Sequence, residues 1–347
     1  MRFAVAIVVF AALARAQFKS TTQLVVAPVT VRDSKGHFVD GLTMDDLILT
    51  DNTVPQTLQM DWMTYPIDLV VAIQTSANSA PVIDKLGGVG TLFSQLLAGG
   101  SGATAMISFS DAVKFHQNFT EDPDAVTHSI RMLRKEGSDA HTLDAMSQAL
   151  SMLQKRPPGR RRIILMIAEK RDRGSEAKLS DVMTQVQRLN ATVYWVAYSP
   201  FLEPFTVKNK VAEDLKPIAE RRKYTDCKPP TPTWQCDRPD ETPVPYEPGP
   251  GGGLYAIGEL ARLRLPDLAG MFADSTGGRT LSFVKQSALE NAIQLISQEV
   301  HRQYIVTFEP KKTNTASEAG TFHSIHVTVK NRPGLHVTTR LGYWAIQ

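Results

Sequence analysis

Residues 69–79 read Leu-Val-Val-Ala-Ile-Gln-Thr-Ser-Ala-Asn-Ser, a continuous apolar run that ends abruptly in small polar residues. Such a run is typical of a central strand that is buried on both faces of a parallel sheet. The polar residues then form the loop that leaves the carboxyl end of this strand. Because open α/β sheets place their binding sites at the carboxyl ends of their strands, we expect the functional site at this loop.

The middle of the chain alternates apolar strands with amphipathic helices. Strands are predicted at residues 69–73, 103–108, 162–167 and 192–197. Apolar residues at helical spacing are found within residues 143–153, 179–189 and 289–300. This alternation predicts an α/β fold, in which a Rossmann-like, doubly wound and mainly parallel sheet is covered by helices on both faces.

Both ends of the chain carry short strands and turns instead. Residues 25–31 are rich in β-branched side chains, and apolar and polar residues alternate after Tyr304 and again after Ile325. Neither end is long enough to bury a core by itself. We therefore expect the N-terminal and C-terminal segments to pair into one small β-domain, with the α/β region inserted between them.

The overall composition of the 347 residues is that of a globular protein, with 42% hydrophobic and 21% charged residues. A formal net charge of +3 is too small to indicate a nucleic-acid partner. The chain also lacks a motif of interleaved basic and aromatic residues that would support one. We therefore expect no nucleic-acid binding.

The first residues have the pattern of a secretory signal peptide. Arg2 supplies the positive charge, residues 3–13 supply the apolar core, and Ala14-Arg15-Ala16 is a small-x-small cleavage site. The apolar core is too short to span a bilayer, and no later segment is apolar enough to cross one. The sequence therefore predicts a secreted or periplasmic protein that has no transmembrane segment after cleavage.

A proline-rich and glycine-rich insertion interrupts the α/β alternation at residues 200–254. The two cysteines of the chain, Cys227 and Cys236, both lie within it. In an exported protein, two neighbouring cysteines are expected to form a disulfide that closes a small loop. Two cysteines with no histidine nearby do not make a structural zinc site.

Three blocks of sequence carry a family resemblance. The first begins at residues 29–43, VTVRDSKGHFVDGLT, and continues through Asp45-Asp46-Leu47 and Asp51-Asn52. The second runs from Leu69 to the STGGR turn, and the third from QYIV at residues 303–306 to RLGY at residues 340–343. In this order and spacing the chain resembles the bacterial secreted proteins, known mostly from acidobacteria, that are related to von Willebrand factor type A (VWA) domains. The resemblance implies a VWA domain and a binding role in place of catalysis.

In VWA domains, partners often bind through a metal-ion-dependent adhesion site, where an Asp-x-Ser-x-Ser turn holds a divalent cation. The matching positions here are Gln74, Ser76 and Asn78, so the leading carboxylate is replaced by a neutral amide. A hard cation such as Mg²⁺ needs charged oxygen ligands to compete with water. The resemblance therefore implies a turn that keeps its shape and loses its charge.

The second loop of such sites usually contributes a threonine, and Ala140 stands at that position, with Asp139 and Thr142 as polar neighbours. The third loop usually contributes an aspartate, where Glu169 is the nearest acid.

Three bases follow Glu169 in the sequence, Lys170, Arg171 and Arg173. Their positive charge opposes a dication, and Glu169 can pair with one of them. We expect a degenerate adhesion site without metal, in which Lys170 and Arg171 contact an anionic group. The alternative is a weak Mg²⁺ or Ca²⁺ site at Ser76, Asn78 and Glu169.

Catalysis is not indicated. The histidines are scattered along the chain, and no nucleophile elbow, phosphate loop or metalloprotease helix motif occurs. We therefore expect neither enzymatic activity nor a cofactor.

The predicted organisation has four parts: a signal peptide at residues 1–16, an N-terminal β segment at 17–64, a VWA-like domain at 65–302 and a C-terminal β segment at 303–347. The predicted function is adhesion or scaffolding through a protein or cell-surface partner, which we expect to be acidic. The alternatives are a weakly Mg²⁺- or Ca²⁺-dependent adhesion protein and a structural component of an envelope assembly. The predicted binding residues are Gln74, Ser76, Asn78, Asp139, Thr142, Glu169, Lys170 and Arg171.

Overall fold

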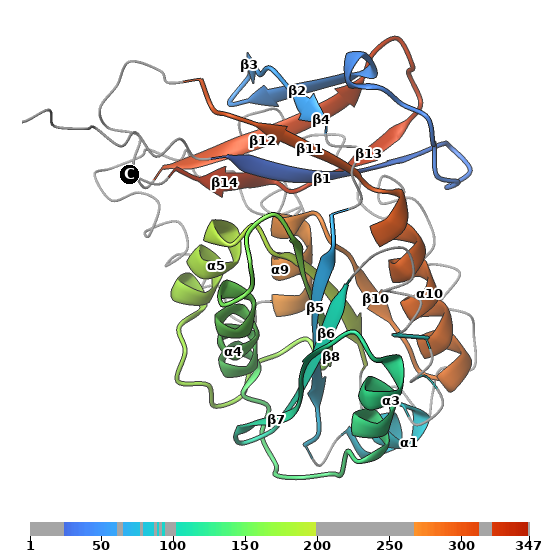
Figure 1. The fold of residues 1–347 in the computed structure, drawn as a ribbon, viewed down its shortest axis with the longest axis vertical. Coiled ribbons are helices and arrows are strands. Elements are labelled where there is room, and N and C mark those ends of the chain that lie inside the picture. The colour runs from blue at the N-terminus through green and yellow to red at the C-terminus, as the bar shows by residue number, and fades with distance from the viewer. Residues whose placement is uncertain are drawn as a thin grey trace, which may run out of the picture.

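Six strands form the central sheet in the computed structural model, which describes residues 24–60, 65–76, 79–86, 89, 92–93, 102–198, 267–311 and 321–345. Their order across the sheet is β10-β9-β8-β5-β6-β7, and within it only β7 runs antiparallel to its neighbour. The strands are β5 (Ile67–Gln74), β6 (Ala103–Phe109), β7 (Val113–Thr120), β8 (Arg161–Ala168), β9 (Thr192–Ala197) and β10 (Thr280–Ser282). The predicted α/β class with a mainly parallel sheet is confirmed (Figure 1).

Strand β5 lies at the centre because both of its faces are apolar. All its residues are buried, and successive side chains enter different cores. Leu69, Val71 and Ile73 belong to one apolar cluster, and Val70 and Ala72 belong to the other. The apolar run at residues 69–73 therefore lies in a strand whose two faces contact the two apolar cores.

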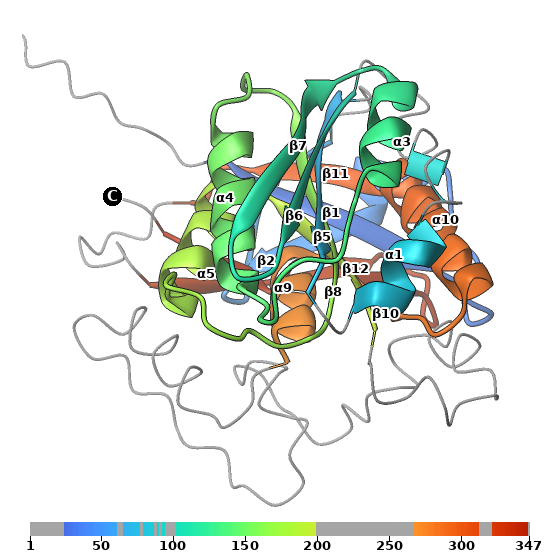
Figure 2. The same cartoon turned by 90° about the horizontal axis from the view of Figure 1, so that it is seen from below.

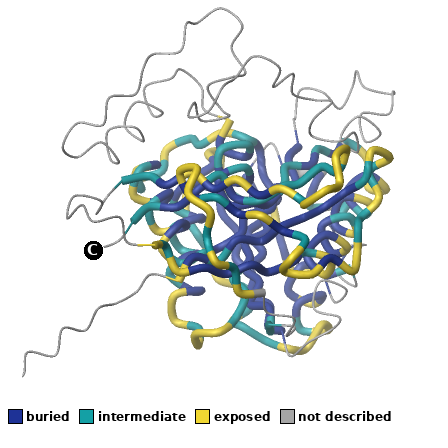
Figure 3. Tube along the Cα trace, turned by 90° about the horizontal axis from the view of Figure 1, so that it is seen from above, coloured by how far each residue is buried: buried dark blue, intermediate teal, exposed yellow. Residues whose placement is uncertain are grey.

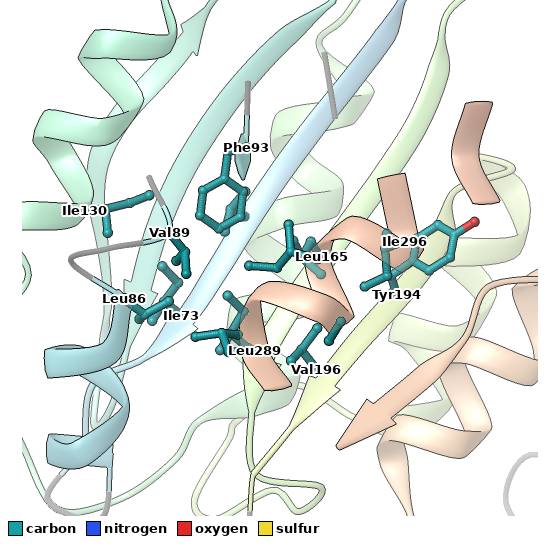
Figure 4. Packing of buried hydrophobic residues seen from close by; sticks show 14 of the residues in the cluster. Ile73, Leu86, Val89, Phe93, Ile130, Leu165, Tyr194, Val196, Leu289 and Ile296 are labelled. Atoms are coloured by element: carbon teal, nitrogen blue, oxygen red, sulfur yellow. The ribbon is translucent and has the colours of Figure 1, made fainter. Parts of the chain in front are cut away.

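Helices cover both faces of the sheet. The helices are α1 (Ala80–Leu86), α3 (Pro123–Arg131), α4 (Thr142–Gln154), α5 (Leu179–Arg188), α9 (Leu268–Thr276) and α10 (Gln286–Arg302). Residues of α1, α3 and α10 pack into the cluster that contains Ile73 and Leu165, shown in Figure 4. Residues of α4, α5 and α9 pack into the cluster on the opposite face. The fold is therefore a three-layer arrangement of helix, sheet and helix.

Two elements between the predicted strands carry weak sequence signals. Strand β7 is the sheet's antiparallel edge, and none of its residues is fully buried. Its polar residues therefore give no apolar run. Helix α9 is short and ends at Gly277, whose positive φ of 75° forms the left-handed cap expected for the STGGR turn.

A separate β-domain is built from both ends of the chain. One sheet has the order β13-β1-β11-β4, and the other has the order β14-β12-β2-β3. The N-terminal strands are β1 (Val25–Arg32), β2 (Leu47–Asp51), β3 (Val54–Pro55) and β4 (Gln59–Met60), with a short 3₁₀ helix, η1, at Met44–Asp46. The C-terminal strands are β11 (Tyr304–Phe308), β12 (Phe322–Val329), β13 (His336–Thr338) and β14 (Gly342–Trp344).

The pairing between the two ends is extensive. Val25 lies opposite Phe308 in the β1–β11 ladder, and Leu47 lies opposite Val329 in the β2–β12 ladder. Side chains from both ends share one apolar cluster, which includes Val29, Leu49 and Val306 among its members. Neither end could form this cluster alone, so the two ends must pair in order to bury their apolar side chains.

The β-domain covers the amino ends of the parallel strands (Figure 1). Arg161, at the start of β8, donates hydrogen bonds to the Val300 carbonyl (2.7 Å) and to the Gln303 side chain (2.7 Å), where α10 leads into β11. The carboxyl ends of the strands lie at the opposite end of the molecule and face the viewer in Figure 2. The expected binding end is therefore far from the β-domain.

Burial follows this layout, with buried strands at the centre and exposed loops around them (Figure 3). Several expectations fall outside the described residues: the signal peptide at 1–16, Asn78, the whole insertion at 200–254, and the Cys227–Cys236 disulfide. Among the described residues, no helix combines the length and apolar composition that a membrane span requires.

Candidate functional site

Loops from three strands meet at the carboxyl end of the sheet. The loop after β5 is tied to β6 by the Thr75 N–H, which donates to the Phe109 carbonyl (2.8 Å). The loop before α4 is tied to the turn after β6 by the His141 N–H, which donates to the Ser110 carbonyl (2.9 Å). The loop after β8 joins them through the Arg173 N–H, which donates to the Ala140 carbonyl (2.8 Å). The predicted site residues on these loops are thus brought to one place.

Gln74 is the buried centre of this site. Its amide nitrogen donates to the Ser76 hydroxyl (2.7 Å) and to Oε1 of Glu169 (3.3 Å). Its side-chain oxygen accepts the Glu169 backbone N–H (2.9 Å). Gln74 and Ser76 have no exposed surface. The amide therefore uses both its donor and its acceptor to connect the β5 and β8 loops.

The Glu169 carboxylate is paired with a protein cation. One terminal nitrogen of Arg173 donates to both carboxylate oxygens, at 2.9 and 3.0 Å. The Arg173 side chain is 39% exposed, whereas that of Glu169 is 12% exposed. Glu169 thus takes one of the three bases that follow it as its partner. The sequence identified the group of bases without distinguishing Arg173 from its neighbours.

Thr142 and Ala140 are the buried residues of the second loop. The Thr142 hydroxyl is buried and donates to the carbonyls of Arg171 (3.0 Å) and Ala140 (3.2 Å). Ala140 is also buried and has no side-chain oxygen. The hydroxyl of Thr142 therefore holds two loops together.

The remaining predicted residues lie at the rim. Asp139 is exposed, and among the described residues only its backbone N–H is hydrogen-bonded, to Oδ1 of Asp111 (2.7 Å). Lys170 contacts Asp267 at 3.2 Å. Arg171 is exposed, and within the described residues its guanidinium makes no hydrogen bond or ion pair. The rim therefore presents both charges, and only Lys170 among these three is paired.

Sequence reasoning missed three acids that fasten these loops. Asp111 accepts the backbone N–H groups of Ser138 and Asp139, and these hydrogen bonds, that from Asp139 above all, lower the pKa of Asp111. Asp172 accepts the Leu143 N–H (3.0 Å) at the start of α4. Asp144 accepts the N–H groups of Glu176 and Ala177. The only available signal was the position of these acids beside loop ends and the helix start.

Tyr198 is a fourth residue that the sequence did not indicate. It follows β9, is buried, and lies close enough to Glu169 and Arg173 for their charges to act on it. Burial raises the pKa of Tyr198, and the Glu169 charge raises it further, so the hydroxyl stays protonated. Although the Ser79 side chain lies nearby, the Tyr198 hydroxyl makes no hydrogen bond of normal geometry to any described residue.

These groups do not fit a hard dication. The oxygen of Gln74 is occupied by a backbone N–H, Glu169 is neutralised by Arg173, and Ala140 supplies no oxygen. Mg²⁺ and Ca²⁺ need several oxygen ligands, with carboxylates among them. Within the described part of the chain, no three His, Cys, Asp or Glu side chains are grouped so that they could hold an ion.

The fold and the loop cluster define a class of α/β binding domain, and comparison with known families specifies it. The family model described as von Willebrand factor type A domain matches residues 71–171. This range runs from β5 through the loop that contains Glu169 and Arg171. The chain therefore contains a VWA domain, and the family resemblance is confirmed at this level. No curated protein matches the chain in sequence.

Several solved structures are similar in fold at low sequence identity. The VWA domain of SpRpn10 is 11% identical, with 39% of this chain and 76% of that chain covered and a TM-score of 0.33. The conserved hypothetical protein BatB from Bacteroides thetaiotaomicron is 15% identical, with 68% and 98% covered and a TM-score of 0.39. An aerotolerance-related membrane protein from Bacteroides fragilis NCTC 9343 is 14% identical, with 68% and 99% covered and a TM-score of 0.38.

Proposed function

We propose that this protein is a secreted or periplasmic interaction module that binds a partner at the carboxyl end of its VWA sheet without a metal ion. The observation that carries the proposal is the pairing of Glu169 with both of its oxygens on Arg173. A bound cation would have to displace this guanidinium. Two positive groups about 4 Å apart repel each other by several kcal/mol at the dielectric of a protein surface.

The loss of charge at Gln74 supports the same function. An aspartate at this position would stand beside Glu169 and create a demand for a cation. The neutral Gln74 amide instead accepts the Glu169 backbone N–H (2.9 Å) and donates to the Glu169 carboxylate (3.3 Å). Because Gln74 is neutral, the positive charge of Arg173 balances the single carboxylate of Glu169, and no second cation is needed for charge neutrality.

The alternative with weak Mg²⁺ or Ca²⁺ binding at Ser76, Asn78 and Glu169 is less favoured for the same reason. Glu169 would have to release Arg173, and the Ser76 hydroxyl would have to turn away from Gln74. The envelope-scaffold alternative relies on sheet edges in the β-domain. The four edge strands there, β13, β4, β14 and β3, are three residues long or shorter, and short edges pair poorly with other chains.

Isothermal titration calorimetry of the full mature chain with Mg²⁺ and with Ca²⁺ tests the proposal. We expect no heat of specific binding from the wild type. The variant Gln74→Asp with Arg173→Ser restores an acid and removes the internal cation, so we expect it to take up Mg²⁺. Ser76→Ala in this variant is the matched control and should weaken that uptake. Stoichiometric Mg²⁺ binding by the wild type that Ser76→Ala abolishes would contradict the proposal.

A further inference from the structure

Acids and bases at the carboxyl end of the sheet are used in different ways. The carboxylates of Asp111, Asp144 and Asp172 each accept backbone N–H groups from a neighbouring loop, and Glu169 is held by Arg173. These four acids are therefore committed to holding the loops in place. Their charge is largely satisfied within the protein and contributes little to attraction of a partner.

The two arginines on the β8 loop keep donors available. Arg171 is exposed, and its guanidinium has no partner within the described residues, while its carbonyl is fixed by the Thr142 hydroxyl at 3.0 Å. Arg173 pairs with Glu169 through a single terminal nitrogen, and 39% of its side-chain surface stays accessible. A guanidinium has five N–H donors, so both groups retain hydrogen-bonding capacity.

Unsatisfied buried donors lie at the same place. Within the part of the chain that the structure describes, Nε of Arg173 is buried without a hydrogen-bond acceptor, and the buried Tyr198 hydroxyl has only the Ser79 side chain nearby. Burial of a donor without an acceptor costs about 1–3 kcal/mol. The site is therefore short of acceptors, which is the reverse of what a cation site requires.

We propose that Arg171 and Arg173 bind a carboxylate side chain from an acidic segment of a partner protein, with guanidinium N–H groups in the role that a metal ion has elsewhere. This inference rests on the proposed function of the site. A carboxylate matches the planar fork of an arginine and accepts two parallel hydrogen bonds. The backbones of both arginines are held by neighbouring loops, so part of the ordering has already occurred before the partner binds.

Nearby acids favour a short acidic segment over a long polyanion. Asp139 is exposed and precedes Ala140, which forms a β-bridge with Arg173, and Glu176 is exposed three residues after Arg173. A uniform polyanion that crosses this surface would meet these like charges. A single side-chain carboxylate carries less negative charge past these acids than a polyanion does, so it is repelled less.

The test uses the full mature chain in EDTA and a peptide with two adjacent glutamates flanked by Gly and Ser, with its glutamine counterpart as the uncharged control. We expect the glutamate peptide alone to shift the side-chain Nε–H signals of Arg171 and Arg173 in NMR spectra. Arg171→Gln and Arg173→Gln should each weaken binding at least tenfold. Arg188→Gln removes an exposed arginine from α5 with the same change in net charge and should have little effect. Asp139→Asn should strengthen binding about two-fold to three-fold, because it removes a like charge.

Several outcomes would overturn the inference. It is contradicted if the two peptides bind equally, or if Arg188→Gln and Arg171→Gln lose the same amount of binding. Saturable binding of dextran sulfate in preference to the peptide contradicts it as well. If Arg173→Gln is unfolded by circular dichroism, Arg171→Gln still decides, because its guanidinium supports no described contact. Peptide binding that needs Mg²⁺ would refute the metal-free function itself. Absence of both metal uptake and peptide binding would refute only the carboxylate assignment.

Discussion

At the scale of single residues, the buried Glu169 depends on Arg173. Replacement of Arg173 by methionine keeps the aliphatic part of the side chain and leaves the Glu169 carboxylate, among the described residues, with the weak Gln74 hydrogen bond at 3.3 Å. We expect this change to lower the free energy of unfolding by about 1–3 kcal/mol. Urea denaturation followed by circular dichroism measures the change.

The double variant Arg173→Met with Glu169→Gln is the decisive partner for this experiment. It removes the uncompensated charge, so it should recover part of the lost stability. Arg171→Met is the matched control for loss of a loop arginine and should stay within about 0.5 kcal/mol of the wild type. Additive effects of Arg173→Met and Glu169→Gln would show that the two side chains do not interact.

The sequence could predict the chemical character of this site but only some of its hydrogen bonds and ion pairs. Gln74, Ser76 and Glu169 follow strands whose ends must meet, so their proximity was predictable from the alternation of strands and helices. Which base pairs with Glu169 depends on loop geometry: Arg173 is brought back by its backbone bond to Ala140. No periodicity encodes such a bond, so the choice among Lys170, Arg171 and Arg173 stayed open.

At the scale of elements, acids in loops hold the sheet end together. Asp111 connects the turn after β6 to the loop before α4, and hydrogen bonds from the Asp139 and Ser138 N–H groups lower its pKa. A group with a lowered pKa stabilises the folded state above its unfolded pKa, about 3.9 for aspartate. This contribution to stability is lost as the pH falls through the lowered pKa that Asp111 has in the folded state.

Comparison of the wild type with Asp111→Asn tests this contribution. The asparagine should be less stable by a constant amount between pH 5 and pH 8, roughly one to four pH units above the ordinary aspartate pKa. We expect the difference to shrink steadily as the pH falls below about 4. Thermal unfolding monitored across this pH range provides the measurement. A difference that grows towards low pH would contradict the assignment of Asp111 as a loop fastener in its ionised form.

The elements themselves were predictable to the degree that they are buried on one or two faces. Strands β5, β6, β8 and β9 are fully or nearly fully buried, and their apolar runs identified them. Strand β7 has a half-exposed edge position and carries His116, Gln117 and Asn118, so its sequence has no such run. Pairing to Phe109 and its neighbours in β6 forms this strand, and a pairing of that kind is a tertiary property.

At the scale of the whole molecule, buried arginines join the β-domain to the VWA domain. Glu299 of α10 is 1% exposed, and one of its oxygens accepts from Arg32 of β1 (2.8 Å) and forms an ion pair with Arg279 (2.7 Å). Burial lowers the pKa of Arg32, and the nearby Arg279 lowers it further. Both guanidiniums depend on this carboxylate.

A second junction lies at Arg340, which precedes β14. Its guanidinium donates to the Val26 carbonyl (3.1 Å) in β1, to Oδ1 of Asn190 (2.7 Å) and to the side chain of Gln187 in α5. Full burial lowers the pKa of Arg340 to about 10. Strands from both chain ends are thus attached to the helical layer at two separate places. The two units should therefore open together.

Hydrogen exchange on the full chain tests this coupling. In the wild type, we expect peptides from β1 and β12 to exchange at the same global free energy as peptides from β5 and β8.

Glu299→Gln leaves two buried guanidiniums without a countercharge, and removal of one partner from a buried ion pair typically costs about 3–5 kcal/mol. We expect that variant to lose stability in both units at once, because α10 and β1 share the carboxylate. Arg302→Gln is the matched control on the same helix, since its 3.6 Å contact with Asp40 is exposed to solvent, and it should have little effect. If β1 and β12 exchange early in Glu299→Gln while β5 and β8 stay protected, the β-domain is an independent unit, and the junction serves only to orient it.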